Sequence, residues 1–166
     1  MSETYDLVVI GAGPGGHAAA EQAARLGARV AIIEKSQWGG TCTYKGCIPT
    51  KALLACSKHS MNLKKLKRLG ISSGEISVDF ASMKRHQRQM ITTSSLGVQK
   101  SLKDSGVDLK SGEGEIIAPR EIEWRTPQGD AHRLIADNVI IAWGSEPLLP
   151  PDITPSRRVV TSDGVL

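Results

Sequence analysis

Short apolar runs alternate along the chain with longer segments in which small or apolar residues recur at helical spacing. Residues 5–10 form a mostly apolar, β-branched run, which predicts a buried parallel strand. A glycine-rich turn follows, and then alanines predict a helix over about residues 14–26, which Gly27 would end. Residues 29–34 predict a second strand. These elements together predict a βαβ unit with a right-handed crossover.

The middle of the chain is more polar and predicts two helices. The first is expected to begin near Cys42 or Cys47, and a loop of Gly and Ser follows it at residues 70–74. Asp79 predicts the N-cap of a long helix that reaches about Lys103. A polar cluster within that helix predicts one exposed face; its members are Lys84, Arg85, Gln87, Arg88 and Gln89.

After residue 107 the pattern changes to short strands separated by turns. Strands are expected at residues 107–110, 112–117, 121–125, 132–136 and 139–142. Prolines after residue 146 then indicate an extended exit segment. The predicted fold class is α/β: a Rossmann-like βαβ domain with an added antiparallel β-meander.

Composition and charge narrow the class of protein. The 166 residues suffice for one domain, and 40% hydrophobic with 23% charged residues is typical of a soluble globular protein. No apolar run approaches the roughly 20 residues that span a bilayer, and the N-terminus lacks the pattern of a secretory signal. We therefore expect a cytoplasmic protein with no membrane partner. The net charge of +4 favours a polyanionic partner only weakly.

A glycine loop follows the first strand. Gly11, Gly13 and Gly16 have the G-x-G-x-x-G spacing that allows a tight turn, close approach to a pyrophosphate and close helix–strand packing. The following helix N-terminus favours phosphate. Glu34, at the end of the second strand, is placed to accept hydrogen bonds from the hydroxyls of an unphosphorylated ribose. The spacing predicts a dinucleotide but does not distinguish FAD from NAD.

Two cysteines separated by four residues, Cys42 and Cys47, follow the glycine loop. A zinc site that recruits Cys56 and His59 would have poor spacing, and a structural disulfide is uncommon in the cytoplasm. Two unpaired core thiols are a further alternative. We favour a redox dithiol, because a position near a helix N-terminus shifts the ionisation of a thiol toward the thiolate. We expect no metal site. A helical segment would place Lys51 on the same side as Cys47.

At these residues the chain resembles the FAD-dependent pyridine nucleotide-disulfide oxidoreductases (class I). The resemblance is carried by residues 9–16, 34–35, 39–42, 46–54 and 137–147. Within the family it most resembles dihydrolipoamide dehydrogenase; mercuric ion reductase is second, and the glutathione-type reductases are a poorer match. Only the N-terminal, FAD-binding segment of the family pattern is present.

The resemblance implies FAD as the cofactor and assigns roles to the thiols. Cys42 would exchange with a small-molecule or lipoyl-domain dithiol, and Cys47 would face the flavin. Lys51 would lie on the flavin side, and Gly114 near the adenine. Electrons would pass from the dihydrolipoyl dithiol through Cys42, Cys47 and FAD to NAD in an intact, homodimeric parent. The residues expected to contact FAD are Gly11, Gly13, Pro14, Gly15, Gly16, Glu34, Lys35, Gly40, Thr41, Cys42, Lys51, Gly114, Trp143 and Gly144.

The chain also departs from the family pattern. Residues 43–45 (Thr-Tyr-Lys) stand where an aliphatic residue, Asn and a small or aliphatic residue are usual, and Trp143 replaces a Thr. We expect residues 1–150 to form the FAD-binding domain and residues 151–166 a linker toward an absent NAD-binding domain. The chain would then be a fragment that is inactive on its own.

Two other functions are weighed against this interpretation. One is a flavin-binding module without turnover. The other is nucleic-acid binding through a basic run, which we consider weak because such runs are usually solvated helix faces; that run comprises Lys58, Lys64, Lys65, Lys67 and Arg68. We therefore expect no nucleic-acid partner.

Overall fold

The computed structural model describes residues 3–66, 69–71, 74 and 77–166. The predicted loop at residues 70–74 falls partly outside these residues, as do Lys67, Arg68 and the side chain of Lys64. The elements in chain order are β1 (Glu3–Ile10), α1 (Pro14–Arg25), β2 (Val30–Glu34), α2 (Gly40–Tyr44), α3 (Cys47–Leu66), α4 (Phe80–Asp104), β3 (Asp108–Ser111), β4 (Glu113–Ala118), β5 (Glu121–Arg125), β6 (Ala131–Ile141) and α5 (Ser162–Val165).

One six-stranded sheet organises the described residues, in the order β3-β2-β1-β6-β5-β4. The strands β3, β2, β1 and β6 are parallel, whereas β6, β5 and β4 form the antiparallel meander. The predicted α/β class and the βαβ unit with its added meander are confirmed. The strand near residues 107–110 pairs in parallel with β2, because α4 returns the chain to that edge of the sheet.

The last strand corrects the sequence prediction. Residues 132–136 and 139–142 were expected as two strands, but β6 is continuous from Ala131 to Ile141. It pairs with β1 along its length, from Glu3 opposite Leu134 to Ile10 opposite Ile141. The polar Asp137-Asn138 pair resembles a turn in sequence, yet the Asn138 amide donates to the Asp6 carbonyl at 3.2 Å and so remains within the sheet.

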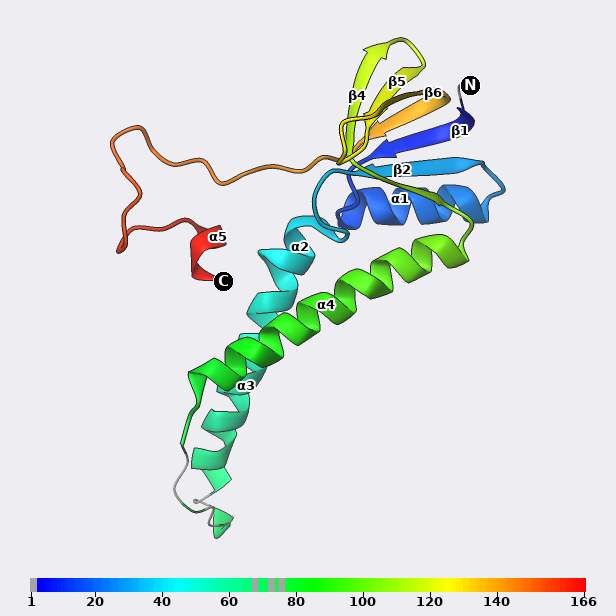
Figure 1. Cartoon of the computed structure of the whole chain (residues 1–166). Coiled ribbons are helices and arrows are strands. Elements are labelled where there is room, and N and C mark those ends of the chain that lie inside the picture. The colour runs from blue at the N-terminus through cyan, green and yellow to red at the C-terminus, as the bar shows by residue number, and fades with distance from the viewer. Residues whose placement is uncertain (1–2, 67–68, 72–73, 75–76) are drawn as a thin grey trace.

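Two apolar clusters cover the two faces of the parallel strands, because alternate residues of a strand point to opposite sides. Leu7 and Val9 of β1 belong to the cluster that contains Ala20 of α1 and Leu102 of α4. The cluster on the other face comprises Tyr5, Val8, Ile10, Ala31, Ile33, Ile122, Leu134 and Ala136. The meander therefore covers one face of the parallel strands, and α1 with the end of α4 covers the other (Figure 1).

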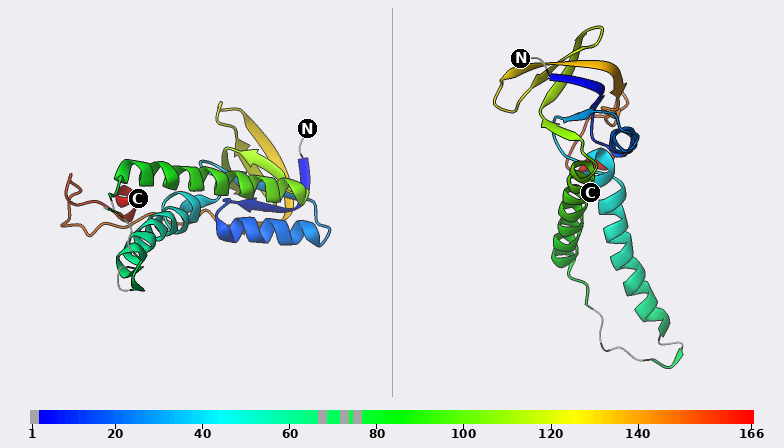
Figure 2. Two further views of the ribbon diagram at one scale, coloured as in Figure 1. Left: turned by 90° about the horizontal axis from the view of Figure 1, so that it is seen from below. Right: turned by 90° about the vertical axis from the view of Figure 1, so that its right-hand side faces the viewer.

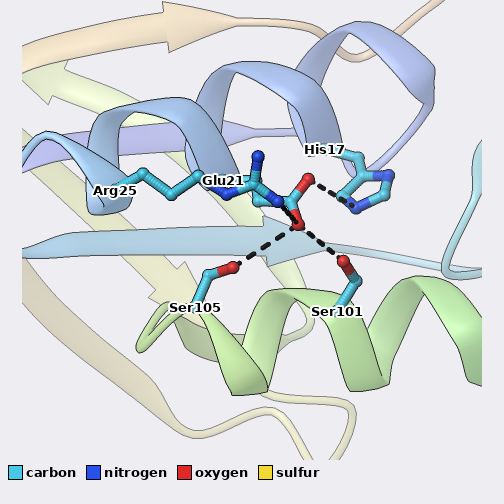
Figure 3. A network of polar contacts seen from close by, with 5 residues as sticks. All are labelled: His17, Glu21, Arg25, Ser101 and Ser105. Carbon is cyan, nitrogen blue, oxygen red and sulfur yellow. Dashed lines mark hydrogen bonds and ion pairs between the residues drawn. The ribbon is translucent and has the colours of Figure 1, made fainter.

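A polar network ties the end of α4 to α1 (Figure 3). The Glu21 carboxylate accepts from the Ser101 hydroxyl at 2.6 Å and from the Arg25 guanidinium at 2.9 Å. His17 Nε2 lies 3.7 Å from the same carboxylate, and this buried atom has no hydrogen-bond partner among the described residues. The hydrogen bond from Ser101 lowers the pKa of Glu21. His17 thus lies beside the carboxylate that joins α1 to α4.

The helices α3 and α4 form a long hairpin that extends away from the sheet (Figures 1 and 2). Asp79 accepts a hydrogen bond from the Ser82 amide at 3.2 Å, which confirms the predicted N-cap of α4. Among the described residues, no helix is long and apolar enough to cross a membrane.

Candidate nucleotide and dithiol site

The glycine loop joins β1 to α1 by close backbone contacts. Gly11 has φ +102°, and its amide donates to the Ile33 carbonyl at 2.8 Å. A Cβ added at Gly16 would lie 1.8 Å from the Gly11 carbonyl oxygen, so the helix can approach the loop only without a side chain there. At Gly13 and Gly15 an added Cβ would meet nothing within 4 Å. The loop is therefore closed toward the fold and open toward the outside.

Glu34 is 8% exposed, and its carboxylate serves the fold. One oxygen accepts from the Ala12 amide at 2.8 Å, and the other accepts from the amides of Ser36 at 2.9 Å and Gln37 at 3.2 Å. The residue predicted as a ribose acceptor thus also clamps the glycine loop onto the turn that follows β2. Its contact with a ribose stays a prediction.

The cysteine segment packs directly on the glycine loop. The Gly39 amide donates to the Ala12 carbonyl at 3.0 Å, and a Cβ added at Gly40 would lie 2.9 Å from the Gly13 Cα. One helix was expected here, but the structure has two, α2 and α3, because Lys45 and Gly46 between them are not helical. This break places Cys42 inside α2 and Cys47 at the first residue of α3.

The Cys47 thiol lies close enough to the Cys42 thiol to affect its ionisation. The hydrogen bond with the Cys47 thiol, followed by burial, raises the pKa of Cys42 above its usual value. The expected shift toward thiolate is therefore wrong for Cys42 in the dithiol form. The nearby Lys51 ammonium acts in the opposite direction on Cys42, with a smaller effect. Both cysteines are free, and Cys47 is the more exposed of the two.

Two buried polar side chains of α4 support the cysteine segment. The Tyr44 hydroxyl donates to the Ser95 hydroxyl at 2.9 Å, and the Gln87 amide donates to the Pro49 carbonyl at 3.3 Å. Gln87 was expected on the exposed face of α4, but it is only 1% exposed. The sequence gives little warning of this inward position, because Gln87 lies among charged residues.

A cavity of 560 Å³ opens between the glycine loop, the turn after β2, α2 and the meander. Its lining contains most of the predicted cofactor residues: Gly11, Gly13, Pro14, Gly15, Glu34, Lys35, Gly40, Thr41, Gly114, Trp143 and Gly144. Gly16, Cys42 and Lys51 are not part of the lining. Gly16 is used in packing, whereas Cys42 and Lys51 lie on the helices next to the cavity.

The lining also contains residues that were not predicted to bind the cofactor, among them Tyr44, Lys45 and Asp163. Lys45 forms an ion pair with Asp163 of α5 at 2.7 Å, and this hydrogen bond raises the pKa of Lys45. Figure 1 shows the extended segment after β6 turning back to bring α5 toward α2. A sequence pattern could not reveal this contact, since the two residues are 118 positions apart.

The residues around the cavity fit FAD. The start of α1 supplies first-turn amides, which have no acceptor within the helix and favour phosphate. The open positions at Gly13 and Gly15 leave room for a pyrophosphate to approach the backbone. Gly114 of β4 also lines the cavity, and a Cβ added there would lie 2.9 Å from the Ile33 Cδ1, so the meander packs on β2 without a side chain at this position. The dithiol lies next to this cavity, as a flavin-linked thiol pair requires.

Comparisons with known proteins agree with this geometry. Dihydrolipoyl dehydrogenase from Chlorobaculum tepidum is 36% identical over 163 residues, which cover 98% of this chain and 35% of that protein. Dihydrolipoyl dehydrogenase from Bacillus subtilis is 33% identical over 175 residues, covering 100% of this chain and 37% of that protein. The chain thus spans about a third of the length of these relatives.

A solved structure shares the fold. The Cu(II) complex of the HOCl-induced flavoprotein disulfide reductase RclA from Escherichia coli matches with a TM-score of 0.79 and 27% identity, over 99% of this chain and 34% of that one. The family model described as pyridine nucleotide-disulphide oxidoreductase matches residues 5–163. The resemblance inferred from the sequence is confirmed, and the chain belongs to the pyridine nucleotide-disulphide oxidoreductase family.

Proposed function

We propose that this chain is the FAD-binding part of a disulfide oxidoreductase of the dihydrolipoyl dehydrogenase kind. It would move two electrons from a dithiol substrate to FAD through Cys42 and Cys47. The main support is the packing of the cysteine segment on the glycine loop, through the Gly39–Ala12 hydrogen bond and the Gly40–Gly13 contact. This packing joins a thiol pair to a nucleotide cavity, and a two-electron thiol couple matches a two-electron cofactor.

The proposed reaction begins with the cysteine pair as a disulfide. A substrate thiolate attacks the sulfur of Cys42, which forms a mixed disulfide and releases Cys47 as a thiolate. The second substrate thiol loses its proton and attacks the substrate sulfur of the mixed disulfide, so that Cys42 leaves. The substrate departs as a disulfide, oxidised by two electrons, and the cysteine pair is reduced by two. The raised pKa of Cys42 favours its protonation after release.

FAD, when bound, supplies the acceptor for these two electrons. The first turn of α1 would hold its pyrophosphate, Glu34 its ribose, and Gly114 would pass close to its adenine. We further propose that the whole protein is a cytoplasmic homodimer that passes the electrons on to NAD. The sequence of this chain contains no second G-x-G-x-x-G loop, so we expect the chain alone not to complete an NAD-linked cycle.

The visible absorption spectrum tests this proposal. The chain is mixed with FAD, desalted and then titrated with a small dithiol. We expect a retained flavin spectrum and a long-wavelength charge-transfer band that appears on partial reduction. The matched control is Cys47→Ser, which should keep the flavin and lose the band. A chain that emerges colourless from desalting would contradict the proposal.

A further inference from the structure

We propose that Tyr44, Ser95 and Gln87 form a brace that positions Cys42 and Cys47 and thereby favours their disulfide over their dithiol form. The inference rests on the proposed function, because it assigns positioning residues to the same cysteine pair. It concerns only residues of this chain and requires no bound flavin.

The first arm of the brace holds the segment of Cys42. Tyr44 follows Cys42 by two residues at the end of α2, and its hydroxyl donates to the Ser95 hydroxyl at 2.9 Å. Ser95 is 4% exposed, so water competes little for this hydrogen bond. Tyr44 is one of the residues at which this sequence departs from the family pattern, which has Asn at that position.

The second arm holds the segment of Cys47. Pro49 follows Cys47 by two residues in the first turn of α3, and its carbonyl accepts from the Gln87 amide at 3.3 Å. Pro49 and Gln87 are both fully buried. Each thiol is thus tied, two residues downstream, to the same helix. Ser95 and Gln87 lie eight residues apart on α4, which is slightly more than two turns and about 12 Å.

The helix α4 can act as a support because its first turn is capped and its last turn is tied to α1. Asp79 caps its first turn by accepting from the Ser82 amide, and Ser101 in its last turn donates to Glu21 of α1 (Figure 3). The two cysteine segments are therefore positioned relative to one rod, which is itself held against the sheet.

This arrangement has a consequence for the redox equilibrium. A disulfide needs the two Cβ atoms at roughly 3.5–4.5 Å, whereas two thiols tolerate a wide range of separations. A brace that restricts α2 and the start of α3 reduces the freedom lost when the disulfide forms. Removing either hydrogen bond returns this conformational freedom to the dithiol form. The two helices can then move relative to each other, because Lys45 and Gly46 between them are not helical. The equilibrium should then shift toward the dithiol.

The experiment measures this equilibrium in the chain without added flavin. In a Cys56→Ser background, the parent and the variants Tyr44→Phe, Ser95→Ala and Gln87→Met are equilibrated with mixtures of oxidised and reduced dithiothreitol. The disulfide fraction is read by alkylation and mass spectrometry. We expect each variant to lower the equilibrium constant for the disulfide by about fivefold, which corresponds to a potential about 20 mV more oxidising.

Double variants and controls sharpen the test. Tyr44→Phe combined with Ser95→Ala should shift the equilibrium no further than either change alone, because the two residues share one bond. The controls are Tyr5→Phe, which removes a buried hydroxyl within the sheet, and Thr92→Ala, which removes an exposed hydroxyl of α4. Both controls should leave the equilibrium unchanged even if Tyr5→Phe lowers the melting temperature.

The outcomes separate this inference from the proposed function. If the brace variants lower the melting temperature but keep the equilibrium constant within about twofold of the parent, the contacts are structural only and the inference is overturned. If the parent itself forms no Cys42–Cys47 disulfide in any mixture, the proposed redox function fails, and the brace fails with it. Tyr44→Phe removes a single oxygen and is the variant most certain to fold.

Discussion

The glycine loop and the cysteine segment lie next to each other, yet they are built on different principles. At the glycine loop the backbone makes the contacts: Gly11 and Gly16 approach neighbouring backbone too closely for any side chain. The cysteine segment also packs on this loop through its backbone, but it is held in addition by side chains of a distant helix, Ser95 and Gln87 of α4. The glycine loop requires positions without a side chain, and the cysteine segment requires particular polar side chains.

This difference determines what each region tolerates. Where backbone atoms leave no room for a Cβ, even an added methyl group displaces the backbone, and this lowers the stability of the whole fold. A hydrogen bond at the edge of the core can be removed at a cost of about 1 kcal/mol, and its loss affects mainly what it positions. Substitutions at the packed glycines of the loop should therefore change stability, whereas substitutions around the cysteines should change the redox chemistry.

The largest effect is expected for Gly16→Ala. The new methyl group would lie 1.8 Å from the Gly11 carbonyl oxygen, which belongs to the backbone and cannot move aside cheaply. We expect the free energy of unfolding to fall by about 3 kcal/mol, measured by urea denaturation of the chain without flavin.

Gly13→Ala is the matched control for this change. It adds the same methyl group in the same loop, at a position where nothing lies within 4 Å. This variant should unfold close to the parent and yet retain less flavin after desalting, because the methyl group points to the open side. Equal destabilisation by both substitutions would refute the division of the loop into a packed and an open side.

The next effect in size is expected for Glu34→Ala. The substitution leaves the buried Ala12 amide without its acceptor at 2.8 Å and removes the acceptor of the Ser36 and Gln37 amides. We expect a loss of about 2 kcal/mol in the free energy of unfolding, measured in the absence of flavin. Glu34→Gln keeps one acceptor oxygen and should lose less. A stability unchanged by Glu34→Ala would mean that the carboxylate serves only the ligand.

The two regions also differ in how well they could be predicted from the sequence. The strand, glycine loop, helix and second strand followed from local periodicity, because a buried parallel strand and a small-residue helix each have a distinct pattern. The continuous β6 was missed because Asp137-Asn138 resembles a turn, and only its pairing with β1 keeps it extended. That pairing joins residues about 130 positions apart.

The support of the cysteines was missed for a related reason. Gln87 and Ser95 are polar residues on a helix rich in charges, and the polar character of its neighbours placed Gln87 on the exposed face. Their burial comes from α2 and α3 packing on α4, which is a tertiary contact. The pKa direction of Cys42 was likewise set by its neighbour Cys47 rather than by the helix terminus that the sequence suggested.

A smaller effect, which should disappear in acid, is expected at the Glu21 network (Figure 3). The hydrogen bond from Ser101 lowers the pKa of Glu21 below its ordinary value of 4.5, so this contribution to stability is fully present above that pH. It is lost as the pH falls through the lowered pKa of the folded state. Glu21→Gln should therefore lower the melting temperature at about pH 6, and its difference from the parent should shrink as the pH falls below 4.5.

The control for this pH dependence is Asp152→Asn, which removes an acidic charge from the exposed exit segment. Its melting temperature should follow that of the parent across the same range. A gap between parent and Glu21→Gln that widens toward acid would reverse the sign argued here and would rule out the carboxylate as the group that ties α1 to α4.

The smallest effect on stability is expected for Trp143→Thr, which tests whether the cavity wall behaves like the rest of the glycine-loop region. The Trp143 side chain lines the cavity and is 62% exposed, so its loss should change the free energy of unfolding by less than about 0.5 kcal/mol. Its indole should nevertheless contact a bound flavin. FAD should quench the tryptophan fluorescence of the parent more strongly than that of the variant, and the variant should bind FAD as tightly or more tightly.

Leu148→Ala, at a 95% exposed position of the exit segment, is the control and should leave both stability and quenching unchanged. Equal quenching in the parent and in Trp143→Thr would place the flavin away from this wall, since the remaining Trp38 and Trp124 are not among the residues that line the cavity.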